Sequence, residues 1–323
     1  MTSPTPPDPS ALVEEALAGN RRAVGRLLTF VEQGGVAADA VTRLMFPHAK
    51  QAEVIGITGA PGAGKSTLVA GVVRALTEAG RRPAVIAVDP SSPLTGGAIL
   101  GDRVRMAAVD TTAFIRSVST RGHAGGLALS IPGAVRILDA SGYDPIIIET
   151  VGVGQVEVDV ASIADTTVVV ATPGMGDAVQ ANKAGLMEVA DVFVVNKADR
   201  PGAADTRRDI ELMLDLSHVT GAERDGYRPP IISTTATEQT GIAELIDAIA
   251  EHRRWLRTNG QILNRRVERA RFELASRIDQ RIDQRLRSLL ATPSAEAAAT
   301  DIANGTQSPV AAAADLLEQL RLR

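Results

Sequence analysis

The most chemically specific stretch of the sequence is a glycine-rich run that ends in a lysine followed by a hydroxyl residue. It matches the pattern G-x-x-x-x-G-K-[ST] and lies between an apolar run, Val54–Thr58, and a helical pattern over Ser66–Thr77. Glycines allow tight turns in which several backbone N–H groups face one phosphate, and the N-terminus of a helix adds positive partial charge. This phosphate motif comprises Gly59, Ala60, Pro61, Gly62, Ala63, Gly64, Lys65, Ser66 and Thr67.

The phosphate motif predicts a nucleotide triphosphatase that depends on Mg²⁺. The Lys65 ammonium is expected to bind the β- and γ-phosphates, and the Ser66 hydroxyl is expected to ligate the metal. Two acidic residues follow other apolar runs, Asp89 after Ala84–Val88 and Glu149 after Ile146–Ile148. Parallel strands bring their carboxyl ends to one edge of a sheet, so both carboxylates are predicted to lie near the metal or its waters.

A second motif indicates which base the nucleotide carries. Asn196, Lys197 and Asp199 match the N-K-x-D signature of GTPases and directly follow the run Val192–Val195. A carboxylate at position 199 can accept hydrogen bonds from both N1–H and the exocyclic amine of guanine, whereas adenine would leave it unpaired. An unpaired buried carboxylate costs several kcal/mol, which corresponds to discrimination on the order of 10³. The stem of Lys197 is expected to cover the face of the base.

Two further segments are predicted to complete the nucleotide site. The segment from Glu149 to Gly152 resembles the D-x-x-G signature, with glutamate in place of aspartate, and the N–H of Gly152 is expected to sense the γ-phosphate. A supporting base loop is predicted after the run Ile231–Ser233. It comprises Ser233, Thr234, Thr235 and Ala236.

The elements between these motifs alternate between short apolar runs and helical patterns. Near-continuous Val/Ile runs are typical of strands that are buried on both faces of a parallel sheet. The runs are Val54–Thr58, Ala84–Val88, Phe114–Val118, Ile146–Ile148, Thr167–Val170, Val192–Val195 and Ile231–Ser233. We therefore predict an α/β P-loop NTPase fold, in which helices flank a mostly parallel central sheet and helical extensions lie at both termini. The expected divisions are an N-terminal helical extension (1–50), a G domain (51–250) and a C-terminal helical arm (251–323).

The C-terminal arm carries an amphipathic pattern. Leu274, Ile278, Ile282 and Leu286 recur every four residues with charged residues between them. A solvated helix on its own domain, a dimerisation arm and a nucleic-acid contact all fit this pattern, and the interspersed acids disfavour the last. Residues 292–308 are predicted to be a linker or weak helix, and Ser308-Pro309 is expected to begin a final helix.

The composition excludes several other classes of protein. The chain has 323 residues, a net charge of −4 and no cysteine, so thiolate nucleophiles, iron–sulfur clusters and cysteine-bound zinc are excluded. Its four histidines show no ligand spacing. The near-neutral charge gives no general attraction to nucleic acid or to membranes, and no run is apolar enough for a membrane span or a secretory signal. We expect a cytoplasmic protein.

Several further stretches resemble the MeaB family, also labelled ArgK, which are G-protein chaperones of adenosylcobalamin-dependent methylmalonyl-CoA mutase. The resemblance extends over nearly the whole chain. The stretches are Val88–Ser92, Gly101–Met106, Ile115–Ser117, Arg121–Gly122, Gly125–Leu127 and, most specifically, Glu149–Gln155. It implies a GTPase that gates cofactor loading and protection of the mutase, with a cobalamin adenosyltransferase as a further partner and a homodimer formed through the C-terminal helices.

The resemblance also implies roles for individual residues. Asp102 is similar to the family's switch residue that approaches Mg²⁺ with GTP bound, and Asp89 and Glu149 resemble the other acids around the metal. The segment Gly174–Lys183 resembles an additional switch that couples the nucleotide state to the mutase. Its working side chains would be Asp177, Gln180 and Lys183.

The residue after Gly152 bears on the rate of hydrolysis. Many GTPases place a water-orienting glutamine there, whereas this chain has Val153, which cannot polarise water. We therefore expect slow intrinsic hydrolysis that accelerates when the mutase brings in Lys183 or Gln155.

Four alternatives stay open at the level of sequence. A nickel-inserting metallochaperone G protein has the same sheet order, but cysteines are absent here and histidines are few. A kinase or ATPase associated with amino-acid transport would use ATP, which the base motif disfavours. A MinD-type ATPase would carry a lysine where Ala60 stands. A scaffold that binds GTP without turnover is the fourth.

Overall fold

The computed structural model describes residues 9–89, 113–119, 126–150, 160–174, 189–220 and 226–321 of the chain. Contacts divide the chain into two compact units, Met1–Phe272 and Glu273–Arg323, which are described separately below. None of the helices in these ranges combines the length and apolar character that a membrane span requires.

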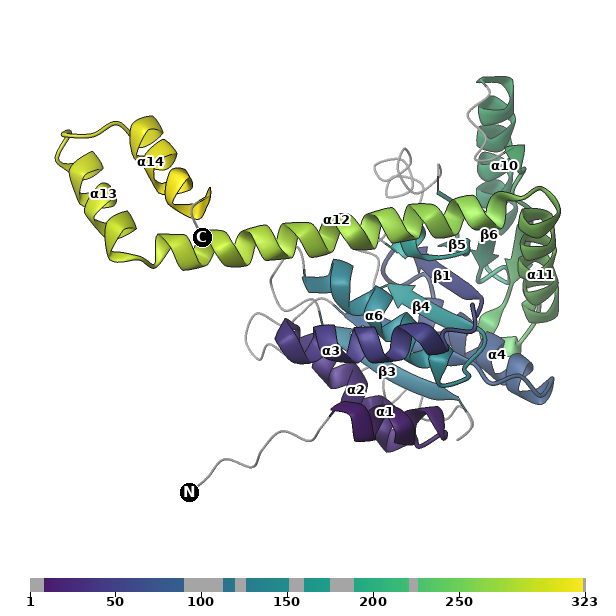
Figure 1. Cartoon of the computed structure of the whole chain (residues 1–323). Helices are drawn as coiled ribbons and strands as arrows, with labels where there is room; N and C mark the ends of the chain where they lie inside the picture. Colours follow the sequence, from purple (N-terminus) through teal and green to yellow (C-terminus); the bar gives the residue numbers. More distant parts are fainter. Residues whose placement is uncertain are drawn as a thin grey trace. The chain divides into compact units, whose positions relative to one another are not determined.

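Seven parallel strands form one sheet within the described part of the first unit (Figure 1). Their order across the sheet is β3-β2-β4-β1-β5-β6-β7. All seven predicted runs are strands, and the predicted mostly parallel sheet is confirmed. The strands are β1 (Val54–Gly59), β2 (Ala84–Asp89), β3 (Phe114–Ser119), β4 (Ile146–Thr150), β5 (Thr166–Ala171), β6 (Val192–Asn196) and β7 (Ile231–Thr234).

The sheet is covered by helices on both faces, which explains why its inner strands are apolar throughout (Figure 1). One core contains Val54, Ile146 and Ile148 together with residues of four helices, α1 (Pro9–Leu17), α2 (Arg21–Gln33), α3 (Gly35–Met45) and α6 (Gly126–Ala140). The opposite core contains Ile55 and Ile57 together with α4 (Lys65–Glu78) and α11 (Ile242–Thr258). Alternate residues of one strand therefore enter different cores, as the period of a strand requires. A further helix, α10 (Ala203–Thr220), packs beside β6 and β7.

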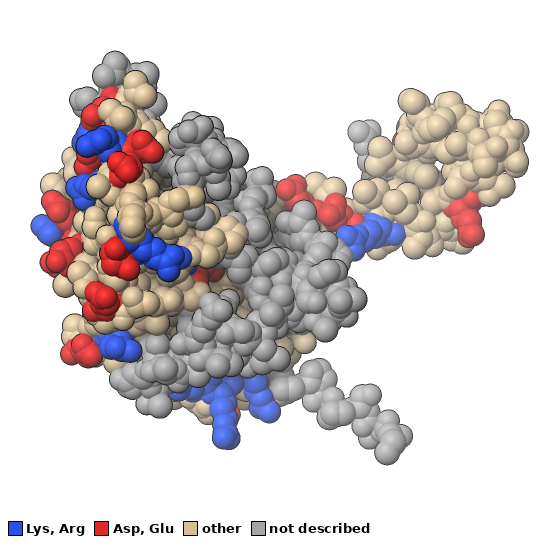
Figure 2. Space-filling view, turned by 180° about the vertical axis from the view of Figure 1, so that it is seen from behind, with Lys and Arg blue, Asp and Glu red and all other residues tan. Residues whose placement is uncertain are grey.

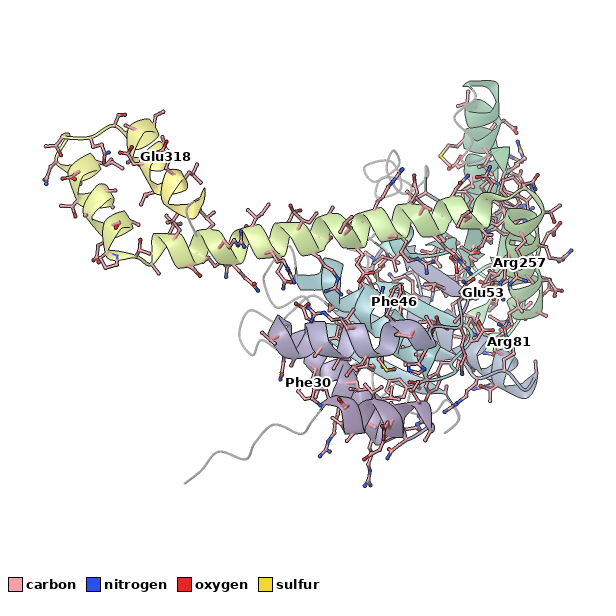
Figure 3. The ribbon with its side chains drawn as sticks, viewed as in Figure 1. Phe30, Phe46, Glu53, Arg81, Arg257 and Glu318 are labelled. Carbon is pink, nitrogen blue, oxygen red and sulfur yellow. The ribbon has the colours of Figure 1, made fainter. Side chains whose placement is uncertain are left out.

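The N-terminal extension consists of α1 (Pro9–Leu17), α2 (Arg21–Gln33), α3 (Gly35–Met45) and the short 3₁₀ helix η1 (Phe46–His48). Asn20 caps α2 by accepting from the N–H groups of residues 22 and 23. The side chain of Arg116 on edge strand β3 forms an ion pair with Glu32 of α2 through two hydrogen bonds. The guanidinium of Arg136 lies over the ring of Phe46, 5.4 Å from its centroid; Phe46 is labelled in Figure 3. This extension is thus packed as part of the first unit.

The described C-terminal region consists of helices joined by short turns. Helix α12 (Gln261–Leu290) begins in the first unit and continues into the second, which also contains α13 (Pro293–Ala303) and α14 (Pro309–Arg321). Thr292 caps α13, because its hydroxyl accepts from the N–H of Ala295. Ser308 caps α14 as predicted, through the N–H of Ala311 at 3.2 Å. Acidic and basic side chains are interspersed over the described surface that Figure 2 shows.

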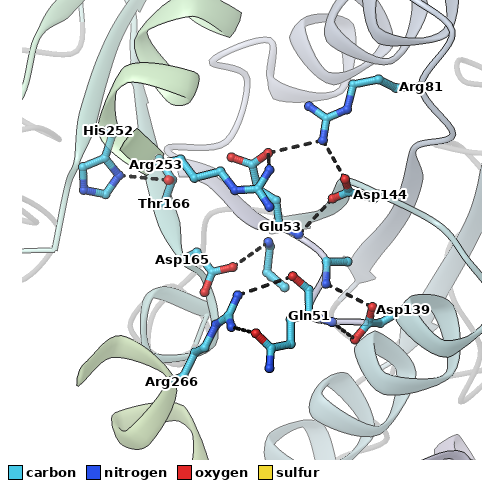
Figure 4. A network of polar contacts seen from close by, with 12 residues as sticks. Gln51, Glu53, Arg81, Asp139, Asp144, Asp165, Thr166, His252, Arg253 and Arg266 are labelled. Carbon is cyan, nitrogen blue, oxygen red and sulfur yellow. Dashed lines mark hydrogen bonds and ion pairs between the residues drawn. The ribbon is translucent and has the colours of Figure 1, made fainter. Parts of the chain in front are cut away.

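A network of buried ion pairs joins α11 and the start of α12 to the amino ends of the strands (Figure 4). The Glu53 carboxylate precedes β1, is buried, and pairs with Arg81 and Arg253. Burial raises the pKa of Glu53, and the two guanidiniums oppose that effect. Asp165 precedes β5, accepts the N–H of Val54 and pairs with Arg269 of α12.

The turn before β1 belongs to the same network. Both oxygens of the Asp139 carboxylate accept backbone N–H groups of Lys50, Gln51 and Ala52, at 3.0–3.1 Å. Gln51 in turn accepts hydrogen bonds from the guanidinium of Arg266. The start of α12 is therefore held at several points below the sheet, at the end opposite to the predicted nucleotide motifs.

Candidate functional site

The phosphate motif forms the turn between β1 and α4, at the carboxyl end of the sheet. Gly59 has φ 140°, and a Cβ there would lie 2.2 Å from the carbonyl oxygen of Val170, so only glycine fits. The Lys65 side chain is buried, and its ammonium donates to the carbonyls of Gly59 and Ala60 at 2.6 and 2.9 Å. Lys65, which is predicted to bind the phosphates, therefore lies over the phosphate loop.

The predicted metal ligands Ser66 and Glu149 are in direct contact. The Ser66 hydroxyl donates to Oε1 of Glu149 at 2.6 Å, and Glu149 is buried at the end of β4. The Cα of Glu149 pairs with Ile57 in the β1–β4 ladder, two residues before the phosphate motif begins. On the other face of the same strand pair, the hydroxyls of Thr58 and Thr150 are 3.0 Å apart and fully buried. The ladder and this pair fix the height of the carboxylate relative to the phosphate loop.

A serine hydroxyl and a carboxylate are oxygen donors of the kind that Mg²⁺ selects. Magnesium commonly keeps water and substrate phosphate among its ligands, so a protein site needs only one or two oxygens. Ser66 and Glu149 therefore fit the predicted ion. The backbone of Asp89 ends β2 at the same edge, but its side chain lies outside the described residues.

The base motif lies against the phosphate motif although the two are far apart in sequence. Asn196 ends β6, is buried, and donates from Nδ2 to the carbonyl of Ala63 at 2.8 Å. Its Oδ1 accepts from the Thr234 hydroxyl at 3.1 Å and from the N–H of Ala236 at 3.2 Å. One amide side chain thus joins three loops, each of which belongs to a predicted part of the site.

The other two residues of the base motif lie in the turn that follows β6. Lys197 adopts φ 57° and donates from Nζ to the carbonyl of Gly62 at 2.8 Å. The next residue, Ala198, donates its N–H to the carbonyl of Thr234 at 3.0 Å, which fixes this turn to β7. Asp199 is exposed at the rim of the same turn. Asp199, the residue predicted to read the base, is therefore exposed in the turn whose Lys197 contacts the phosphate loop.

Within the supporting base loop, Thr234, Thr235 and Ala236 are buried and Ser233 is exposed. The backbones of Thr235 and Thr240 exchange hydrogen bonds of 3.1 and 3.3 Å, which closes the loop. Gly241 makes the return possible: its φ is 78°, and a Cβ there would lie 2.2 Å from the carbonyl of Ser233. The second half of this loop is not among the predicted residues, although Gly241 before an apolar helical pattern was an available signal.

Six predicted residues lie outside the described part of the chain. They are Asp102, Gly152, Gln155, Asp177, Gln180 and Lys183. Of the additional switch segment, only Gly174 is described. The structure therefore assembles the phosphate motif, Glu149 and the base motif, while the roles assigned to the two switches and to Gly152 stay predictions.

Comparison with known protein families identifies the family of this chain. The family described as "Methylmalonyl Co-A mutase-associated GTPase MeaB" matches residues 24–290, which is most of the chain. The chain belongs to the MeaB family. The match begins within α2 and covers α3, the whole sheet and α12.

Individual relatives agree with this assignment of the MeaB-family chain. A protein of Pyrococcus abyssi whose name describes it as a GTPase is 49% identical over 265 residues, covering 81% of this chain and 82% of the relative. GTPase ArgK of Escherichia coli is 38% identical over 250 residues, covering 76% of each. A crystal structure of an LAO/AO transport system kinase has a TM-score of 0.70 and 26% identity, covering 99% of this chain and 100% of the other. With the nucleotide motifs in place, the MeaB-family chain is a P-loop GTP hydrolase.

Proposed function

We propose that this chain is a Mg²⁺-dependent GTPase that acts as a chaperone of methylmalonyl-CoA mutase, gating the loading and protection of its adenosylcobalamin. The bond from Asn196 to the carbonyl of Ala63 is the observation that carries the nucleotide part, because it joins base reading to phosphate binding in one site. The mutase part rests on the family's own description as mutase-associated. We infer a cobalamin adenosyltransferase as a second partner from the same resemblance.

The residues of the site divide the work of binding and hydrolysis. Asp199 would accept the two N–H groups of guanine, and Lys65 would neutralise charge on the β- and γ-phosphates. Ser66 and Glu149 would hold Mg²⁺, with Asp89 and Asp102 nearby; when bound, the ion supplies positive charge to the phosphate oxygens. Since this catalysis is mostly positioning and electrostatic stabilisation, a pre-formed site of this kind is what the reaction needs.

The residue after Gly152 bears on how the attacking water is oriented. Val153 follows Gly152, and an apolar side chain there cannot orient water. We infer that hydrolysis is slow until the mutase rearranges a switch and brings in Lys183 or Gln155, with Asp177 and Gln180 taking part in the same contact. Gating then follows directly, because the client would control how long the GTP state lasts.

The decisive experiment measures binding and turnover with the mutase present. Purified methylmalonyl-CoA mutase should bind the GTP-analogue and GDP forms with different affinities in calorimetry, and it should increase the rate of GTP hydrolysis. Lys183→Ala should keep its intrinsic rate and lose this stimulation. If the variant responds to the mutase as wild type does, Lys183 has no such role; if no nucleotide form binds the mutase, the client assignment fails.

We also propose that the second unit contributes to a homodimer. Leu274, Ile278, Ile282 and Leu286 form a stripe along α12, and their side chains are between 42% and 60% exposed in the isolated chain. A helix with a regular apolar stripe normally buries it against another surface. The division into an extension (1–50), a G domain (51–250) and an arm (251–323) is our proposal for how these tasks are separated.

A further inference from the structure

The side chain of Gln239 lies between the base loop and the phosphate-binding helix. It ends the short 3₁₀ helix η3 (Ala236–Glu238) in a left-handed conformation with φ 60°. Its Nε2 donates to the carbonyl of Ala236 at 3.0 Å. The amide also lies against Gly71 of α4: a Cβ at Gly71 would be 3.0 Å from Oε1 and 3.2 Å from Nε2 of Gln239. The glutamine therefore contacts both elements at once.

These contacts are part of a closed series of connections between the base loop and the phosphate motif. The N–H of Ala236, whose carbonyl Gln239 binds, donates to Oδ1 of Asn196 at 3.2 Å. Asn196 donates to the carbonyl of Ala63 in the phosphate motif at 2.8 Å. The phosphate motif continues into α4, which returns to Gln239 at Gly71. The base loop is thus tied to the phosphate site at two places, through Asn196 on one side and through Gln239 on the other.

Gly71 is an unexpected residue for its position. It is buried in the interior of α4, where glycine is less favourable than alanine because it loses more backbone freedom on folding. Its φ is not left-handed, so the backbone does not require glycine there. The space that the missing side chain leaves is occupied by the amide of Gln239 and by Cδ1 of Ile242, 3.2 Å from the Cβ position. Space for these two side chains is the physical reason for the glycine.

We propose that Gln239 is a positioning residue for guanine recognition, and that Gly71 provides the seat that holds it. The inference rests on GTP being the nucleotide. Gln239 does not touch the base in this scheme; it sets the distance of the 234–236 backbone from the phosphate site. Displacing it would weaken contacts to the guanosine part of the ligand while leaving the phosphate contacts unchanged.

The first test replaces the amide without changing its size. Gln239→Glu keeps the shape and the backbone strain, but a carboxylate has no hydrogen to donate to the carbonyl of Ala236. GDP affinity measured by calorimetry should fall about tenfold, as expected for one lost hydrogen bond. Affinity for inorganic pyrophosphate, which lacks the guanosine, should stay as in wild type. The ratio of GDP to IDP affinity should also stay unchanged, because Asp199 and not this loop reads the 2-amino group.

The second test changes Gly71, the residue that leaves space for the Gln239 amide. Gly71→Ala should weaken GDP binding several-fold by pushing the Gln239 amide away, while the helix preference of alanine offsets part of the stability lost by crowding Ile242. Gly25→Ala is the matched control: Gly25 also lies inside a helix, α2, but nothing lies within 4 Å of its Cβ position. In a Gln239→Gly background, Gly71→Ala should cost no further GDP affinity, because no amide is left to displace.

The outcomes separate this inference from the assignment of the nucleotide. Wild-type GDP affinity in both Gln239→Glu and Gln239→Gly would overturn the positioning role. A parallel loss of pyrophosphate affinity would also overturn it, because the change would then act through the phosphate motif. If wild-type protein instead binds ADP as tightly as GDP, the guanine assignment fails, whatever Gln239 does.

Discussion

Replacing Arg265 by methionine is expected to destabilise the first unit by about 3–5 kcal/mol, the cost of breaking a buried ion pair from one side. Arg265 lies near the start of α12, and its two terminal guanidinium nitrogens donate to the Asp191 carboxylate at 2.9 and 2.8 Å. The two side chains are only 5% and 2% exposed. The same carboxylate accepts the N–H of Thr167 at 2.8 Å, so it connects β5, β6 and α12.

The magnitude follows from what the substitution leaves behind. Two charge-assisted hydrogen bonds are lost, each worth about 1.5–3 kcal/mol, and a carboxylate stays buried without its cation. Two effects limit the cost. Methionine fills part of the volume with apolar atoms, and Nε2 of His252 lies 3.4 Å from Oδ1 of Asp191 as a remaining partner. The expected value is therefore that of a broken buried pair rather than a larger sum.

Guanidinium unfolding at pH 7 measures this directly. Trp255 is the only tryptophan of the chain, and its ring is stacked over His252 with centroids 6.3 Å apart, so its fluorescence reports on this region. Arg257→Met, at an exposed arginine, is the matched control and should stay within about 0.5 kcal/mol of wild type. The pair Asp191→Asn with Arg265→Met should be less unstable than the sum of the single changes, by about 1–3 kcal/mol. If Arg265→Met costs less than about 1 kcal/mol, Asp191 is not left buried without compensation and the reasoning is refuted.

Three further changes test other parts of the molecule. Asp199→Asn should weaken GTP binding by about 10²–10³-fold and improve binding of xanthosine triphosphate, because an amide can donate to the 2-oxo group of xanthine. Calorimetry with both nucleotides measures this. Equal losses of affinity for the two nucleotides would contradict base reading by this side chain. Burial raises the pKa of Glu53, so the stability that its protonated form gives is present below its ordinary value of 4.5 and lost as the pH rises through the raised pKa. The melting temperature of Glu53→Gln minus that of wild type should therefore increase as the pH rises from 4.5 to neutrality. A temperature difference that stays constant over this pH range would argue against the raised pKa. Ile282→Glu should convert a dimer into monomers in sedimentation experiments without lowering intrinsic GTP hydrolysis, whereas unchanged sedimentation would remove the exposed stripe as the interface.

The sheet could be predicted from sequence because its strands are buried on both faces. A run such as Val192–Val195 has no solvent side, so it is apolar throughout and its ends are marked by polar residues. Each strand extends about one residue beyond its apolar run, as Asn196 does at the end of β6, because the ladder continues after the apolar residues stop. The phosphate and base motifs could be located for the same reason, since they are the polar residues that follow directly.

The network at the amino ends of the strands could not be predicted in the same way. Asp191 and Arg265 are 74 residues apart, and Asp165 and Arg269 are 104 apart. A charge pattern on one helix does not say which distant acid it meets, and the arginines of α12 were read only as the polar face of an amphipathic helix. A local signal was an aspartate just before each of two strands, at Asp165 and Asp191. Such an acid can accept the first N–H groups of a neighbouring strand, as both do here.

Strand β6 gives a final test, because the buried ion pair lies at its amino end and the nucleotide site lies at its carboxyl end. Asp191 precedes it and holds the start of α12, while Asn196 ends it and joins the base loop to the phosphate motif. Five residue steps separate them, about 16 Å along an extended strand. Changes that far apart normally add, so the stability loss of Arg265→Met and the GTP-affinity loss of Asp199→Asn should combine without interaction in the double variant. If Arg265→Met by itself lowers GTP affinity more than about threefold, β6 transmits displacement along its length, and the two ends of the sheet cannot be treated as independent.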